Sequence, residues 1–80
     1  MNKIILDARE LEHPKPLEEA SLILQKLDNS SYMYMLHRKN PIPLLDLANE
    51  HSFQTLSTQI DNDWHIIICK NQQINLEELL

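Results

Sequence analysis

The chain has 80 residues, contains no glycine and carries a formal net charge of −5. A P-loop, a dinucleotide-binding turn or an EF-hand loop needs glycine wherever the backbone approaches a phosphate or takes a positive φ, so these classes of nucleotide and calcium site are excluded. The acidic balance argues against a general nucleic-acid binder and a binder of anionic membranes, and the apolar runs are far shorter than the roughly 18 to 20 residues that span a bilayer.

The first third of the chain predicts a strand followed by a helix. Residues 3–6 are a short apolar run, which fits a strand buried on both faces. Pro16 then sits where a first helical turn begins, and apolar residues recur at spacings of three and four over 16–28. Asn29 follows the helix as the expected left-handed residue, because asparagine is the usual substitute for glycine there.

The next segments predict a second strand and helix and then a hairpin. Residues 32–36 are apolar and aromatic, which is typical of a central strand, and Pro43 opens a helix that closes near His51. The polar run 53–60 predicts an exposed strand, and 64–69 predicts a buried one. The two are joined at Asp61, Asn62 and Asp63.

The order β-α-β-α-β-β predicts a two-layer α/β sandwich, with a four-stranded mixed sheet and both helices on one face. Crossover connections imply parallel pairing, but they leave the rest of the strand order open. We expect one domain over residues 1–70. Residues 71–80 are either a frayed tail or one or two helical turns that dock on the domain or a partner.

One face of the predicted sheet is left without helices. Either Met33 and Met35 or Tyr32 and Tyr34 point toward it. A contiguous apolar patch there would favour a homodimer through the open sheet face.

The pattern P-x-P-L occurs twice, at 14–17 and at 41–44, each time between a predicted strand and a predicted helix. Proline before a helix imposes an extended approach and then fixes φ for the first turn. Each loop therefore presents a helix N-terminus at the carboxyl end of its strand. The repeat is either a pair of helix starts or part of a ligand site.

Polar side chains collect in the same two loops, where open α/β sheets tend to bind ligands. The candidate ligand-binding residues are Asp7, Arg9, His13, Lys15, His37 and Arg38. With two helix N-termini beside them, these residues predict a site for a small anion or an acidic protein partner. The alternative is that the loop charges only neutralise the acidic residues close by.

Other chemistries find less support in the sequence. His13 and His37 could meet at the shared edge as a metal or haem site, but no metal-ligand spacing is present. Cys69 lies in an apolar run, which predicts a buried structural thiol. His65 is predicted to lie on the sheet surface. No catalytic residue and no cofactor is predicted. A single cysteine and the lack of a signal-like apolar run predict a cytoplasmic protein.

The chain resembles the TusA/SirA sulfur-carrier superfamily over about residues 4–70. The resemblance rests on the element order, on the opening Leu6-Asp7-Ala8-Arg9 and on the helix start at 14–17. It extends to a family of small TusA-like domains, found in bacteria alone or beside hemerythrin-like domains. These share Arg38, the second P-x-P-L and a tryptophan like Trp64.

The resemblance implies a sulfur-carrier scaffold, with two departures. His13 stands at the position of the carrier cysteine before Pro14, and imidazole cannot hold a persulfide. Glu10 and His51 stand where the family commonly has glycine. The leading expectation is therefore a non-enzymatic binding or accessory domain. The resemblance also implies a redox protein partner, because the related domains occur beside hemerythrin-like domains. The alternative is a sulfur-transfer or redox role in which His13 replaces the cysteine.

Overall fold

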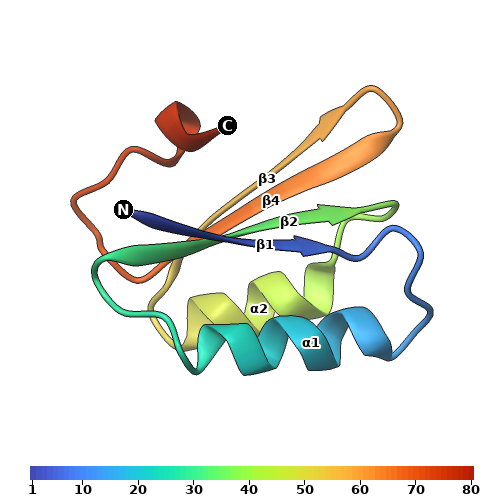
Figure 1. The fold of residues 1–80 in the computed structure, drawn as a ribbon, viewed down its shortest axis with the longest axis horizontal. Helices are drawn as coiled ribbons and strands as arrows, with labels where there is room; N and C mark the ends of the chain where they lie inside the picture. The colour runs from blue at the N-terminus through green and yellow to red at the C-terminus, as the bar shows by residue number, and fades with distance from the viewer.

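The computed structural model describes residues 1–80 as a four-stranded sheet with two helices packed on one face (Figure 1). The elements, in chain order, are β1 (Asn2–Asp7), α1 (Lys15–Leu24), β2 (Ser31–His37), α2 (Ile42–Glu50), β3 (Gln54–Ile60), β4 (Asp63–Cys69) and the 3-10 helix η1 (Leu76–Leu79). The predicted fold class is confirmed. The first helix ends four residues earlier than the periodicity predicted.

The strand order is β1-β2-β4-β3. β1 and β2 are parallel, whereas β4 is antiparallel to both of its neighbours. The predicted hairpin of the last two strands is present, with Ile60 opposite Asp63 across its two-residue turn. Because β3 ends at the outer edge, the connection through α2 passes across β4, which lies between β2 and β3.

The main core lies between the sheet and the helices. Met33 and Met35 of β2 are fully buried there, together with Ile66 and Ile68 of β4. Ala20 and Ala48 face them from the two helices, and these small residues let the helices approach the sheet closely. Each fully buried large aliphatic side chain contributes roughly 1.5 to 3 kcal/mol to folding. The apolar stripes of the sequence therefore account for this layer.

The expectation for the first strand was wrong in one respect. β1 is an edge strand, and Ile5 at its centre is 63% exposed, although 3–6 was predicted to be buried on both faces. An apolar run of four residues does not specify how many neighbours a strand has. The helix layer covers Ile4 and Leu6 but leaves Ile5 uncovered.

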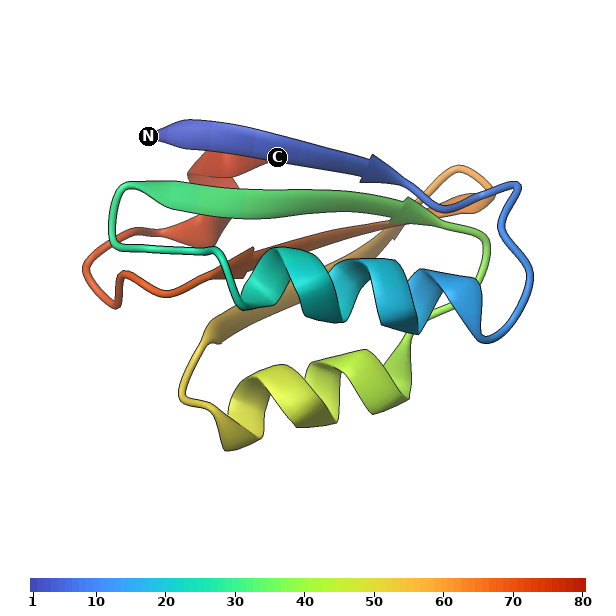
Figure 2. The same cartoon turned by 60° about the horizontal axis from the view of Figure 1, so that its bottom comes forward.

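The open face of the sheet carries the tyrosines, and the C-terminal segment covers part of it. Tyr32 packs there with Ile67, Cys69 and Leu76. η1 lies on the opposite side of the sheet from the two helices (Figure 2). Within residues 71–80, the turn Leu76–Leu79 is thus helical and packs on the sheet through Leu76.

The left-handed positions differ from those predicted. Positive φ occurs at Ser52 (63°) and Asp61 (56°), and not at Asn29, where the sequence predicted it. Ser52 lies two residues after the end of α2, and Asp61 is the first residue of the hairpin turn. In a chain without glycine, a serine and an aspartate take these conformations.

Candidate functional site

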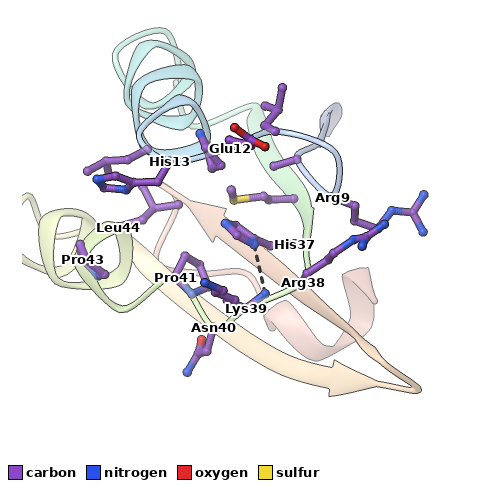
Figure 3. A pocket seen from close by; sticks show the side chains of 15 residues that line it. Arg9, Glu12, His13, His37, Arg38, Lys39, Asn40, Pro41, Pro43 and Leu44 are labelled. Atoms are coloured by element: carbon purple, nitrogen blue, oxygen red, sulfur yellow. Dashed lines mark hydrogen bonds between the residues drawn. The ribbon is translucent and has the colours of Figure 1, made fainter.

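A cavity of about 500 Å³ lies at the carboxyl ends of β1 and β2, between the starts of the two helices (Figure 3). Its polar lining comes from the end of β2 and from the two loops that contain the P-x-P-L segments. The polar side chains are those of Arg9, Glu12, His13, His37, Arg38, Lys39 and Asn40. Glu12 is the only carboxylate among the lining residues. Four of the six predicted ligand-binding residues line this cavity, whereas Asp7 and Lys15 do not.

The two P-x-P-L segments leave few free amide donors at the helix N-termini. Pro16 and Pro43 have no N–H, and Lys15 N–H donates to the Glu12 carbonyl oxygen at 2.8 Å. In the second loop, Ile42 N–H donates to the Asn40 carbonyl oxygen at 2.9 Å. The helix starts therefore offer fewer free backbone donors than the P-x-P-L pattern predicted.

One amide in each helix start remains unpaired. These are the N–H groups of Leu17 and Leu44, which bond no backbone or side-chain acceptor of the chain. Both residues line the cavity. The repeated motif thus places a single backbone donor from each helix beside the same space.

Arg9 is held by two carboxylates. Its Nε and Nη2 donate to Asp7 at 2.9 and 2.8 Å, and its Nη1 donates to Asp63 at 3.1 Å. The hydrogen bonds from the Arg9 side chain lower the pKa of Asp7 from 3.8 to about 2. Arg9 therefore joins the end of β1 to the start of β4, and little of its charge is left for a ligand. Spacing along the chain gave no sign of Asp63, which lies 54 residues away.

The remaining cations are less firmly held. Arg38 Nη2 donates to Glu10 at 2.8 Å, but their side chains are 64% and 85% exposed. An exposed pair of this kind contributes about 0 to 1 kcal/mol, so a ligand can replace Glu10 at small cost. Lys39 forms no ion pair, and Lys15 lies 3.9 Å from Glu18 outside the cavity. Lys39 was not among the predicted ligand-binding residues, although it follows Arg38 directly.

His37 has a defined tautomer. Its Nδ1 accepts the backbone N–H of Lys39 at 3.1 Å, so the proton of the neutral ring is on Nε2. Burial, and to a smaller extent the charge of Lys39, lowers the pKa of His37. The ring is thus a neutral imidazole that has one free N–H donor.

The two histidines line one cavity without bonding each other or Arg9. Figure 3 shows the His13 ring near the start of α2 and the guanidinium groups of Arg9 and Arg38 extending to the opposite side. No group of three or more His, Cys, Asp or Glu side chains is arranged to hold a metal ion. The cavity therefore offers hydrogen-bond donors and positive charge, and not a set of metal ligands.

Cys69 and His65 lie on the open face of the sheet, outside this site. Cys69 is fully buried beneath the C-terminal segment, as its apolar run predicted. His65 is not a plain surface residue, because its Nδ1 shares a hydrogen bond of 2.6 Å with the Tyr34 hydroxyl. The two rings meet edge to face at 5.6 Å. Alternation along β4 placed His65 on this face, but only the register with β2 reveals its partner.

Comparison with known proteins supports the fold and goes no further. No protein-family model and no curated protein matches the chain. Among solved structures, the SirA-like protein of Desulfitobacterium hafniense is similar, with a TM-score of 0.73 and 22% sequence identity. The match covers 86% of this chain and 99% of that one. The chain therefore has the fold of a SirA-like protein. No helix in it has the length and apolar character needed to cross a membrane.

Proposed function

We propose that the chain is a non-enzymatic binding domain that takes an anionic group into the cavity between its two P-x-P-L helix starts. The observation that carries the proposal is the lining of the cavity. In an acidic chain of net charge −5, this one space is bordered by Arg38, Lys39 and two imidazoles, with Glu12 as the single lining carboxylate. Arg9 also lines it, but its charge is neutralised by Asp7 and Asp63. Its volume of about 500 Å³ is within the range of roughly 300 to 1,000 Å³ that is usual for small-ligand sites.

The donors available match the needs of an oxyanion. The unpaired N–H groups of Leu17 and Leu44 each offer one hydrogen bond near the positive end of a helix. His37 adds Nε2–H, and Lys39 adds a charge that no carboxylate of the chain neutralises. A phosphate, a sulfate or the carboxylate of an acidic side chain would satisfy several of these donors at once. The anion is therefore either free in solution or presented by an acidic partner.

Binding is favoured over sulfur transfer by the positions of the residues that could carry sulfur. His13 stands before Pro14, where the sulfur carriers that the chain resembles have their cysteine. A carrier needs an accessible thiolate, and the one thiol, Cys69, is fully buried on the other face of the sheet. Neither residue can form a persulfide in this fold.

The proposal is tested by following backbone amide signals in NMR while phosphate, sulfate or a short polyglutamate peptide is added. The amides of Leu17, Leu44 and Lys39 should shift with a common saturation curve. In the double variant R38Q/K39Q the dissociation constant should rise at least about tenfold, because two charge-assisted contacts are removed. The matched control K70Q removes an exposed charge outside the cavity and should bind as the wild type does.

The outcomes separate the sources of the anion. Saturation by phosphate or sulfate supports a small ligand, and saturation by the peptide alone supports an acidic partner. No shift at millimolar concentration of any of the three would overturn the proposal. Equal shifts in R38Q/K39Q and the wild type would also overturn it, because the cavity would then not be the site. Mass spectrometry after persulfide treatment should show no added sulfur on the folded chain.

A further inference from the structure

The outer edge of β1 is unpaired. β1 is the first strand in the order β1-β2-β4-β3, so it has a neighbour on one side only. Figure 2 shows it along the rim of the sheet, with α1 beneath the sheet and no element beyond its outer side. The strand is six residues long and has no proline to protect this edge. An edge of this kind can pair with another strand.

The residues that present the free backbone groups follow from the bonds at the ends of the strand. Asn2 N–H donates to the Ser30 carbonyl oxygen at 2.7 Å, and Ala8 N–H donates to the Leu36 carbonyl oxygen at 2.8 Å. Backbone groups alternate sides along a strand, so the even-numbered residues face β2. The N–H and C=O groups of Lys3, Ile5 and Asp7 therefore point outward, which makes six unpaired groups in all.

The side chains of the same three residues have a symmetric pattern. Ile5 lies at the centre and is 63% exposed. Lys3 lies two residues before it and Asp7 two residues after it, so all three side chains lie on the open face of the sheet. The apolar residue at the centre of the edge thus has opposite charges two residues away on either side.

The two charges differ in how far they are already paired within the chain. Lys3 has no carboxylate partner, and its Nζ lies 4.4 Å from the centre of the Tyr34 ring. Asp7 shares Arg9 with Asp63, so the cluster of these three groups has a net charge of −1. One end of the edge is therefore positive and the other negative.

We propose that β1 pairs antiparallel with β1 of a second copy of the chain, about a twofold axis at Ile5. This register places Ile5 opposite Ile5 of the partner subunit, and Lys3 opposite Asp7 of the partner subunit in both directions. All six free backbone groups are then hydrogen-bonded, and two ion pairs flank an apolar contact. The result is an eight-stranded sheet through the dimer. The outer edge of β1 is not part of the cavity lining, so dimer formation and anion binding can be tested independently.

The other edge of the sheet lacks this pattern. β3 carries no charged residue between Gln54 and Ile60, and a twofold axis at Ser57 would place threonine opposite glutamine. Its outer part also lies beside the docked C-terminal segment, because Gln54 Nε2 donates to the Asn71 and Ile74 carbonyl oxygens at 2.8 and 3.0 Å. Self-complementary charge is therefore particular to β1.

The first test measures the oligomeric state by sedimentation equilibrium and the protection of backbone amides by hydrogen exchange. The wild-type chain should show a dimer whose formation slows exchange at Lys3, Ile5 and Asp7. Ile5→Lys places like charges on the twofold axis, and Lys3→Asp places two aspartates opposite each other. Each should weaken the dimer at least about tenfold. The control Lys26→Asp makes the same charge change on an exposed residue after α1 and should leave the dimer unchanged.

A mixing experiment tests the register itself. K3D carries two acidic positions on the edge, and D7K carries two basic ones, so each should be monomeric alone. A heterodimer of the two has opposite charges at both flanking positions, so an equimolar mixture should recover the dimer. Circular dichroism of each variant checks that it is folded. If D7K is unfolded, the Ile5→Lys variant still tests whether β1 forms the interface.

Three outcomes would overturn the proposal. The first is a wild-type chain that stays monomeric at about 1 mM. The second is a dimer that Ile5→Lys leaves intact, which would place the interface elsewhere, for example on the open face. The third is folded K3D and D7K chains that do not associate when mixed.

Discussion

The backbone N–H of Lys39 donates to Nδ1 of His37, the last residue of β2, at 3.1 Å. The bond holds the imidazole against the turn that follows β2 and leaves Nε2 as its only free nitrogen. Protonation at Nδ1 would break this bond, and burial of the ring also disfavours the charged form. The loop therefore keeps a neutral imidazole beside the exposed cations of Arg38 and Lys39.

This arrangement predicts a particular dependence of stability on pH. The pKa of His37 is lowered below 6.5, mainly by burial, so the unfolded chain binds more protons just below that pH. The free energy of unfolding should then fall as the pH drops from 6.5 through the pKa of the folded state. An NMR titration of the His37 ring should give a midpoint below 6.5, and Lys39→Gln should raise it only partway. A midpoint above 6.5 would contradict the assigned tautomer and burial.

A second pH dependence is expected in acid. The pKa of Asp7 is lowered from 3.8 to about 2, chiefly by hydrogen bonds from the Arg9 side chain. Between these two values the unfolded chain binds more protons, so the stability that Asp7 contributes should be lost as the pH falls through this window. In Arg9→Met the Asp7 pKa should return toward 3.8 in a carboxyl NMR titration. Arg38→Met is the matched control, and a shift of equal size in it would refute the assignment.

The fold could be predicted because its elements are specified locally. Each helix has a proline start and an apolar stripe, and the hairpin is marked by Asp61 and Asn62 between two strand patterns. The order of the strands could not be predicted in the same way. Ile66, Ile67 and Ile68 are all fully buried, which fits the inner position of β4, but the shorter run of β1 lies at the edge. Hydrophobicity alone does not separate these cases, because burial also depends on what covers each face.

The location of the candidate site could be predicted from the sequence, but its ion pairs could not. Parallel strands bring the ends of β1 and β2 together, and this explains why His13 and His37 line one cavity. The carboxylate partners of the two arginines could not be predicted. Asp63 contacts Arg9 from a strand that is distant in sequence, and Glu10 contacts Arg38 from the other loop. Such contacts depend on the strand order and on side-chain reach, neither of which a spacing pattern contains.

The docked C-terminal segment predicts a change in the reactivity of the single thiol. Leu76 is 7% exposed and packs with Tyr32, Ile67 and Cys69, and Cys69 is fully buried. Leu76→Ala should weaken the docking by about 2 kcal/mol or more, which raises the population of the undocked segment about 30-fold. Labelling of Cys69 by a thiol reagent should accelerate accordingly. Leu80→Ala, at a residue 49% exposed, is the control, and equal labelling rates in both variants would show that the segment does not protect the thiol.

The lack of glycine predicts where the chain can be made more stable. Ser52 has a φ of 63°, a conformation that costs a residue with a side chain about 1 to 2 kcal/mol. Glycine avoids this cost but loses about 0.5 to 1 kcal/mol more backbone entropy on folding. The net gain for Ser52→Gly is therefore about 0 to 1.5 kcal/mol, and its central value of about 0.75 kcal/mol corresponds to a rise in Tm of roughly 3 to 6 °C. The carbonyl oxygen at position 52 would keep its hydrogen bond from Gln72 Nε2, because Ser52→Gly leaves the backbone carbonyl in place.

Asn29→Gly provides the matched comparison, since the sequence pattern predicted a left-handed residue there and the structure has none. Glycine at Asn29 brings only the entropic loss, so its Tm should fall while that of Ser52→Gly rises. Thermal unfolding of the two variants by circular dichroism measures both shifts against the wild type. If both variants lost stability, the positive φ at Ser52 would not be a source of strain. If both gained it, the effect would not depend on the backbone conformation at either position.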